Sequence, residues 1–285
     1  MTQTEWPAPA KINLFLHVVG RRPDGYHLLQ TVFQFLDLAD TLTLRLRRDG
    51  EIRRVQTVSG SVAGPAATIP PQADLCVRAA LRLKQESGTS LGADIGVTKR
   101  IPLGSGLGGG SSDAATTLLV LNDIWELHWP RDRLAALGLT LGADVPVFVM
   151  GHAAFAEGVG EQLTPVDPPE SPVLLLWPRT HATTAEVFQQ LKLTAFTPPI
   201  TIRDFRAQGL RNDLEETACA LYPEIGKTLK WLRQFGPARM TGSGSCVFLP
   251  VADAAAGQRL LAELPPELGD AWLARTVNTH PLAAR

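Results

Sequence analysis

The residues best suited to chemistry lie in a glycine-rich stretch between Ile101 and Asp113. Five glycines fall within seven residues, and two serines and an aspartate follow them. Glycine permits positive φ and lets backbone N–H groups approach a ligand closely. The apolar run behind it, residues 114–122, predicts a helix whose N-cap we expect at Ser111, Ser112 or Asp113. A helix N-terminus carries unpaired donors and about half a positive charge, so the stretch suits a phosphate chain.

Several kinds of loop produce such a stretch. A P-loop needs a lysine directly after its last glycine, and none is present here. A dinucleotide-binding fingerprint matches at Gly104, Gly106 and Gly109, but its acidic partner should close the next strand, whereas Asp123 falls in the predicted helix. A solvated linker would not be flanked by an alternating apolar segment and an apolar helix. The longer pattern Pro-x-Gly-x-Gly-Leu-Gly-Gly-Gly-Ser-Ser fits best.

Two further candidates lie far from the loop in sequence. Residues 11–19 alternate between apolar and polar, which predicts a half-buried strand with Lys11 and Asn13 on the same face. Periodicity alone favours a solvated polar face there. Asp144 lies between Gly142 and Pro146 in an otherwise apolar segment. Its side chain could cap a helix N-terminus or act as a reactive carboxylate, and the sequence does not decide between these roles.

Two adjacent pairs are ambiguous in the same way. Tyr26 and His27 follow a turn with a Pro-Asp-Gly core, and on their own they are turn-flanking residues. Lys99 and Arg100 directly precede the glycine loop, where a solvated pair is favoured over phosphate contacts.

Composition excludes several classes of protein. The 285 residues are 45% hydrophobic and 19% charged, which is typical of a globular chain. A net charge of −1 gives no sign of a nucleic-acid partner. The three cysteines are scattered and form neither a disulfide framework nor a zinc motif. The first residues lack the basic region and apolar run of a signal peptide, and no apolar run reaches the roughly 20 residues that span a membrane, so we expect a cytoplasmic protein without a signal peptide.

The order of predicted elements indicates two domains. A dense proline cluster at residues 165–172 suggests a boundary that gives domains 1–165 and 166–285. Strand, helix and glycine-turn segments after it fit an α+β second domain. We expect a hairpin and surface loop at 48–70, strands at 40–47, 95–98, 173–177 and 271–278, a hairpin at 152–166, a strand–turn–strand unit at 238–249, and helices at 73–86, 129–137, 183–191, 222–235 and 253–264. A capping box is expected at Thr183 and Glu186.

Five motifs together resemble a known superfamily. They lie at residues 9–16, 22–27, 101–115, 141–146 and 241–247. The glycine loop and the late Gly-Ser-Gly turn resemble the GHMP kinases. The other three motifs are similar, within that superfamily, to the kinases that phosphorylate 4-diphosphocytidyl-2-C-methyl-D-erythritol in the non-mevalonate isoprenoid pathway. The loop departs from the expected pattern at Ser105 and Asp113, which leaves the Mg²⁺ ligand open.

The resemblance implies a fold and a set of roles. The fold would be α+β, with an N-terminal domain like ribosomal protein S5 and a ferredoxin-like C-terminal domain. Asp144 would accept the proton of the attacking hydroxyl, with Lys11 holding it ionised. The loop would bind the phosphates of ATP with Mg²⁺, and Ser112 is the candidate metal ligand. The implied ATP-binding residues are Pro102, Leu103, Gly104, Ser105, Gly106, Leu107, Gly108, Gly109, Gly110, Ser111 and Ser112.

The same resemblance implies how a cytidylated substrate would be bound. Asn13 would orient its hydroxyl, Tyr26 would stack on the cytosine and His27 would hydrogen-bond to it. Phe188 would close the other face of the base. Backbone donors would come from the turn formed by Gly242, Ser243 and Gly244. We expect a small-molecule substrate, no nucleic acid or membrane partner, and a monomer or weak homodimer.

Two rival classes remain open. Another GHMP enzyme, such as a mevalonate-type kinase or the related decarboxylase, would share the loop and Asp144 but has no use for the pair Tyr26 and His27. A non-catalytic nucleotide-binding protein of the same fold would not need both Lys11 and Asp144. An enzyme is therefore favoured.

Overall fold

The computed structural model describes residues 5–57, 70–191, 195–204 and 211–284. Its strands are β1 (Glu5–Arg21), β2 (His27–Arg47), β3 (Ile52–Thr57), β4 (Gly92–Thr98), β5 (Ala154–Glu157), β6 (Gln162–Pro165), β7 (Pro172–Trp177), β8 (Arg239–Met240), β9 (Val247–Pro250) and β10 (Asp270–Val277). Its α-helices are α1 (Leu75–Ser87), α2 (Gly109–Ile124), α3 (Arg131–Leu139), α4 (Val145–Met150), α5 (Thr184–Gln190), α6 (Glu215–Leu221), α7 (Pro223–Leu232) and α8 (Ala254–Glu263). The prediction of an α+β fold is confirmed.

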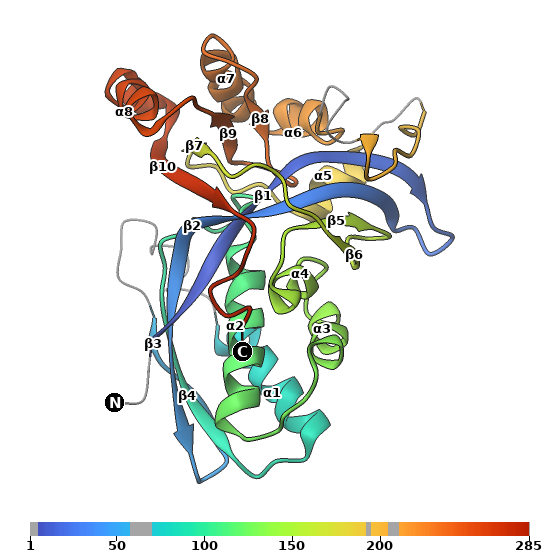
Figure 1. Cartoon of the computed structure of the whole chain (residues 1–285), viewed down its shortest axis with the longest axis vertical. Coiled ribbons are helices and arrows are strands. Elements are labelled where there is room, and N and C mark those ends of the chain that lie inside the picture. Colours follow the sequence, from blue (N-terminus) through green and yellow to red (C-terminus); the bar gives the residue numbers. More distant parts are fainter. Residues whose placement is uncertain (1–4, 58–69, 192–194, 205–210, 285) are drawn as a thin grey trace.

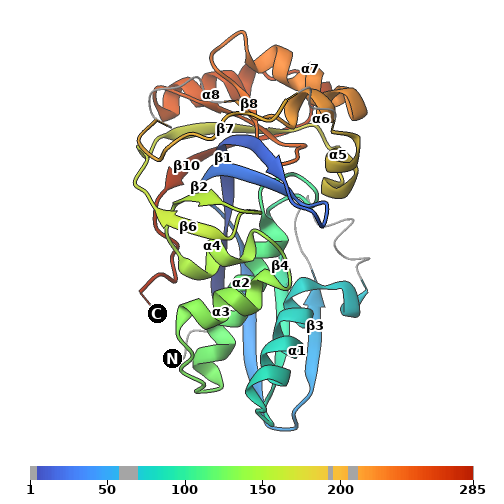
Figure 2. The same ribbon diagram turned by 90° about the vertical axis from the view of Figure 1, so that its right-hand side faces the viewer.

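A long hairpin of β1 and β2 runs through the whole molecule (Figures 1 and 2). It closes at the turn where Gly25 N–H donates to Arg22 O, as the sequence predicts. Both faces of β1 are covered, because Ile12 is 0% exposed on one and Lys11 is 2% exposed on the other. The expectation of a half-buried strand with a solvated polar face is therefore wrong.

The strands of the first part lie in the order β3–β4–β2, with α1 and α2 packed together beside them. A buried apolar cluster between helices and sheet includes Leu83, Ile95 and Leu118. The hairpin predicted within residues 48–70 is wrong, because β3 pairs in parallel with β4. The rest of that segment, residues 58–69, lies outside the described residues.

The second part continues the same sheet in the order β10–β7–β9–β8. Figure 1 shows α6, α7 and α8 gathered at this end of the molecule. The predicted amphipathic helix α7 buries Ile225, Leu229 and Leu232, as its spacing indicates. The strand β10 also pairs with β2, so the last strand of the chain joins the first hairpin. The predicted domain boundary at 165/166 falls at the end of β6 and stays a prediction.

One predicted helix start and one predicted capping box are corrected. Helix α2 begins earlier than expected, with Gly108 at its N-cap in the left-handed region (φ 74°), because only a glycine there fits the turn. Residues 111–113 therefore lie within the first turns of the helix. Helix α5 has Thr183 at its N-cap without a side-chain capping bond. Glu186 instead accepts a hydrogen bond from Tyr222 Oη at 2.6 Å, so no capping box forms.

Candidate active site

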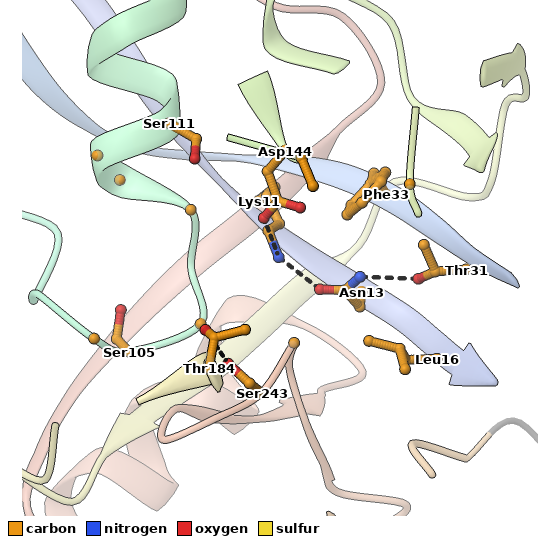
Figure 3. Close-up of a pocket in the computed structure, with 18 of the residues that line it drawn as sticks. Lys11, Asn13, Leu16, Thr31, Phe33, Ser105, Ser111, Asp144, Thr184 and Ser243 are labelled. Atoms are coloured by element: carbon orange, nitrogen blue, oxygen red, sulfur yellow. Dashed lines mark hydrogen bonds and ion pairs between the residues drawn. The ribbon is translucent and has the colours of Figure 1, made fainter. Parts of the chain in front are cut away.

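A cavity of about 440 Å³ lies between the glycine loop, β1, and the turn before β9. Most of the predicted site residues meet at it, although they come from segments more than 200 positions apart in the sequence, from Lys11 to Ser243. Figure 3 shows Lys11, Asn13 and Asp144 on one side and Ser105, Thr184 and Ser243 on another. The cavity is therefore built jointly by the two parts of the sheet.

The glycine loop has the geometry that its composition predicts. Gly104, Gly106 and Gly108 all have positive φ, between 62° and 77°. A Cβ on Gly106 would lie 2.3 Å from Thr241 O, so no other residue fits this close approach. Cys246 N–H donates to Ser105 O at 2.8 Å, which joins the loop to the second part of the molecule.

The loop presents donors to the cavity. Because α2 begins at Gly109, the N–H groups of its first three residues have no acceptor inside the helix. The predicted ATP-binding residues that line the cavity are Pro102, Leu103, Gly104, Ser105, Gly106, Gly108, Gly109, Gly110 and Ser111.

Two members of the predicted ATP-binding set do not reach the cavity. Leu107 is 0% exposed and belongs to an apolar cluster. Ser112 is also 0% exposed, and its Oγ has no hydrogen-bond partner among the described atoms. Of the two adjacent serines, Ser111 is the one that lines the cavity. The structure therefore does not bring the side chain of Ser112 to a place where it could bind a metal on the nucleotide.

The predicted catalytic pair is an ion pair. Lys11 Nζ lies 3.2 Å from Asp144 Oδ2, and the Lys11 side chain is 3% exposed whereas that of Asp144 is 32% exposed. Asp144 occupies the N-cap position of α4, but its side chain makes no capping hydrogen bond. The carboxylate is therefore held by the lysine and faces the cavity, where it can accept a proton.

Asn13 is fixed by its neighbours. Its Oδ1 accepts from Lys11 Nζ at 2.7 Å and from Thr241 Oγ1 at 3.3 Å. Its Nδ2 donates to Thr31 Oγ1 at 2.9 Å (Figure 3). Because an amide oxygen has two acceptor positions and an amide nitrogen two donors, one N–H of Asn13 remains for a ligand. The role of Thr31 and Thr241 was missed, because nothing in strand periodicity singles out a threonine.

Phe188 marks one rim of the cavity, but the three residues predicted to hold a base do not form a sandwich there. His27 and Phe188 stack on each other, with ring centroids 5.2 Å apart and planes 24° from parallel. Phe188 lines the cavity, whereas Tyr26 is 66% exposed and does not line it. Partial burial, and then the nearby Arg21, lower the pKa of His27, which favours the neutral imidazole.

The late glycine turn contributes two of its three predicted residues. Gly242 and Ser243 line the cavity, whereas Gly244 does not. Ser243 Oγ and Thr184 Oγ1 are 2.7 Å apart and share a hydrogen bond across the two segments. Thr184 also lines the cavity, and we did not identify it from the sequence, although it directly follows the N-cap of a predicted helix.

A charged cluster lies beneath the glycine loop. Lys99 is 4% exposed and its Nζ donates to Asp40 and, at 2.7 Å, to Asp113. The expectation that Lys99 is solvated is therefore wrong. Burial raises the pKa of Asp113 to about 7, against the opposing effect of the Lys99 charge. Burial also disfavours the charged form of Lys99, yet Asp113 and Asp40 hold the pKa of Lys99 above its usual value.

Within the part of the chain that the structure describes, neither a metal-binding cluster nor a membrane-spanning helix is found. Among the residues that the structure describes, no group of three or more His, Cys, Asp or Glu side chains is placed to hold a metal ion. In the same part of the chain, no helix has the length and apolarity that crossing a membrane requires.

Comparison with known proteins gives a consistent result. Residues 74–152 match the GHMP kinases N terminal domain, and residues 202–271 match the GHMP kinases C terminal domain. The chain is 52% identical over 276 residues to the 4-diphosphocytidyl-2-C-methyl-D-erythritol kinase of Aromatoleum aromaticum, covering 97% of this chain and 94% of that one. It is 54% identical over 258 residues to the protein of that name in Pseudomonas putida, covering 90% and 87%.

Solved structures agree. A crystal structure of 4-(cytidine 5'-diphospho)-2C-methyl-D-erythritol kinase matches with a TM-score of 0.78 and 34% identity, covering 95% of this chain and 98% of that one. Mevalonate kinase from Methanococcus jannaschii shares the fold, with a TM-score of 0.69 at 16% identity over 97% and 99% of the two chains. The chain therefore belongs to the GHMP kinases and, within them, to the family of 4-diphosphocytidyl-2-C-methyl-D-erythritol kinases.

Proposed function

We propose that this enzyme transfers the γ-phosphoryl group of ATP to the 2-hydroxyl of 4-diphosphocytidyl-2-C-methyl-D-erythritol, a step of the non-mevalonate isoprenoid pathway. One observation carries the proposal. The Lys11–Asp144 ion pair lies at a cavity that is also lined by a glycine loop at a helix N-terminus, and this loop packs directly against Lys11. A phosphate site facing a carboxylate that can accept a proton is what phosphoryl transfer to an alcohol requires.

Each of these residues has a distinct role in the proposed reaction. N–H groups at the start of α2 bind the phosphates and keep the terminal phosphoryl group facing the cavity. Asp144 accepts the proton of the 2-hydroxyl as the oxygen attacks phosphorus and the bond to the leaving ADP oxygen breaks. Lys11 compensates the negative charge near the reacting oxygens, because its Nζ lies beside Asp144. The free N–H of Asn13 orients the hydroxyl.

The nucleotide brings Mg²⁺ in this proposal. The donor set fits a metal that is held mainly by phosphate oxygens, since the described residues contain no cluster of His, Cys, Asp or Glu that could hold one. Ser111, which lines the cavity, would contribute a ligand in place of the expected Ser112. The ion would neutralise charge on the transferred group.

The rim of the cavity accounts for the choice of substrate. A cytosine would enter beside Phe188 by separating it from His27, which exposes one ring for stacking and a neutral imidazole for hydrogen bonding. Tyr26, at the exposed tip of the turn, would close over the other face of the base. We also keep as predictions a cytoplasmic location and a monomer or weak homodimer.

A substrate panel tests the proposal. ATP with Mg²⁺ is offered with the cytidylated methylerythritol, mevalonate, homoserine and galactose in parallel, and ADP release is measured. We expect ADP release with the cytidylated substrate alone. ADP release with mevalonate at a comparable rate would instead favour a mevalonate-type enzyme. If none of the four acceptors raised ADP release above the background rate, the assignment as a kinase would be contradicted.

A further inference from the structure

The buried cluster beneath the glycine loop contains two carboxyl groups and a single ammonium group. Lys99 Nζ is bonded to Asp40 Oδ2 and Asp113 Oδ2, and the three residues are 4%, 0% and 5% exposed. Buried charges cost free energy unless they are paired, and two carboxylates here share a single ammonium group. Two carboxyl groups below a site for phosphates are also unfavourable on electrostatic grounds alone. The positions of these three residues relative to the glycine loop explain the presence of the cluster better than its charge does.

Asp40 holds the start of the loop. The Asp40 Oδ1 atom, which Lys99 does not use, accepts the backbone N–H of Ile101 at 2.9 Å and that of Arg100. Both residues directly precede Pro102, the first loop residue that lines the cavity. Asp40 itself is on β2, which is fixed by strands on both sides.

Asp113 holds the end of the loop. It lies in the second turn of α2, directly after Ser112, and its Oδ2 is tied through Lys99 to β2. Lys99 Nζ also packs beneath Gly109, at 3.3 Å from the position that a Cβ on Gly109 would occupy. The three side chains therefore connect the first and last residues of the loop to one point on β2.

We propose that Asp40, Lys99 and Asp113 are positioning residues that clamp both ends of the glycine loop and so set the geometry of its N–H groups toward ATP. The inference rests on the proposed role of the loop in binding ATP. The alternative is that Lys99, which also lines the cavity, binds phosphate directly with its remaining N–H.

The clamp hypothesis and the direct-ligand hypothesis predict opposite changes in ATP affinity for the same substitution. Asp113→Asn and Asp40→Asn each replace a carboxyl group with a neutral amide and remove one ionisable partner of Lys99. If Lys99 acts as a direct phosphate ligand, or if net charge decides, ATP binds more tightly in these variants. If the cluster clamps the loop, ATP binds more weakly, because a misplaced set of donors loses on the order of 10- to 100-fold.

The experiment measures the Kd of a non-hydrolysable ATP analogue by calorimetry, together with KM for both substrates. Asp94→Asn is the matched control, since it removes an ion pair with Arg47 that joins β2 to β4 away from the loop. We expect Kd and KM for the nucleotide to rise about tenfold or more in Asp40→Asn and Asp113→Asn. KM for the cytidylated substrate should stay within about twofold in these variants, and Asp94→Asn should match the wild type.

A second pair of variants keeps the test decisive if an aspartate variant does not fold. Lys99→Met leaves two buried carboxylates unpaired, whereas Lys99→Arg keeps the charge, so Lys99→Arg should recover nucleotide affinity relative to Lys99→Met. Tighter or unchanged nucleotide binding in folded Asp40→Asn or Asp113→Asn would overturn the clamp, as would equal rises in KM for both substrates. A wild-type enzyme that does not bind the analogue would instead refute the proposed function.

Discussion

Lys11 Nζ and Asp144 Oδ2 lie 3.2 Å apart, and the two side chains differ sharply in exposure, 3% against 32%. The lysine is thus part of the interior while the carboxylate faces the cavity. Lys11 N–H also donates to Leu107 O at 2.9 Å, which ties this strand residue to the glycine loop. One residue of β1 therefore links the proposed proton acceptor to the proposed phosphate site.

Gly108 offers a test of the loop with a close control. Gly108→Ala forces a side chain into φ 74° at a position where its Cβ would lie 3.0 Å from Lys11 and Phe148 carbons. Gly88→Ala imposes the same backbone strain at φ 70° in open space. Each should cost about 1 to 2 kcal/mol of stability. We expect only Gly108→Ala to lose most of the increase in melting temperature that an ATP analogue causes, and an equal increase in both variants would remove this loop from the phosphate site.

The rim aromatics should govern substrate affinity. Stacking of an aromatic ring on a base is worth about 1 to 3 kcal/mol, so Tyr26→Ala should raise KM for the cytidylated substrate by about 5- to 150-fold. His27→Ala should also raise KM for the cytidylated substrate, because it removes the proposed hydrogen bond to the base and the imidazole ring that stacks on Phe188. KM for ATP should stay nearly constant in both.

An exposed aromatic elsewhere serves as the control for these two variants. Phe235, 42% exposed after α7, contacts Trp231 and does not line the cavity. Phe235→Ala should leave both KM values unchanged. If Tyr26→Ala and His27→Ala raised KM for both substrates equally, or for neither, the base would have to bind elsewhere.

The pH dependence of stability should depend on His280. Burial, and then the nearby Arg131, lower the pKa of His280 to about 3. Its Nδ1 accepts the Leu282 N–H at 3.0 Å, so protonation at that atom breaks a hydrogen bond. Because the folded pKa lies below the unfolded value of about 6.5, this stability is complete above pH 6.5 and is lost as the pH falls toward 3.

Denaturant unfolding at two pH values measures this effect. Between pH 7.5 and pH 5, His280 should account for a loss of about 2 kcal/mol in the free energy of unfolding. His280→Asn keeps an acceptor near the Leu282 N–H and should show less of this loss. His128→Asn changes an exposed histidine and should behave as the wild type. An identical pH dependence in His280→Asn and wild type would refute the assignment.

Much of the site could be predicted because its chemistry is local in sequence. The glycine loop combines its turn, its donors and its helix within a few residues, so that composition alone indicates a phosphate site. The side chains of Lys11 and Asn13 were expected on one face of a strand, and the 2.7 Å hydrogen bond between them agrees. That Asp144 pairs with Lys11 required the resemblance to a family, because the two residues are 133 positions apart.

The features that could not be predicted depend on contacts between segments that are far apart in the sequence. Alternation in residues 11–19 is the same whether a polar face meets water or a second layer, and here the second layer buries Lys11. Lys99 looked solvated because its partners Asp40 and Asp113 lie 59 and 14 residues away. The parallel pairing of β3 with β4 was also not predicted, since short polar strands and hairpin loops have similar compositions.

The turnover number of Asp144→Asn tests the central claim most directly. The substitution keeps the shape of the side chain and removes the proton acceptor beside Lys11. Asp167→Asn is the control, because that carboxylate is 77% exposed and outside the cavity. With both substrates saturating, ADP release by Asp144→Asn should fall by about 10² to 10⁴, nearer the lower value if the transition state is loose. An ATP analogue should still raise the melting temperature. A kcat within about threefold of the wild type would contradict the assignment of Asp144 as the proton acceptor.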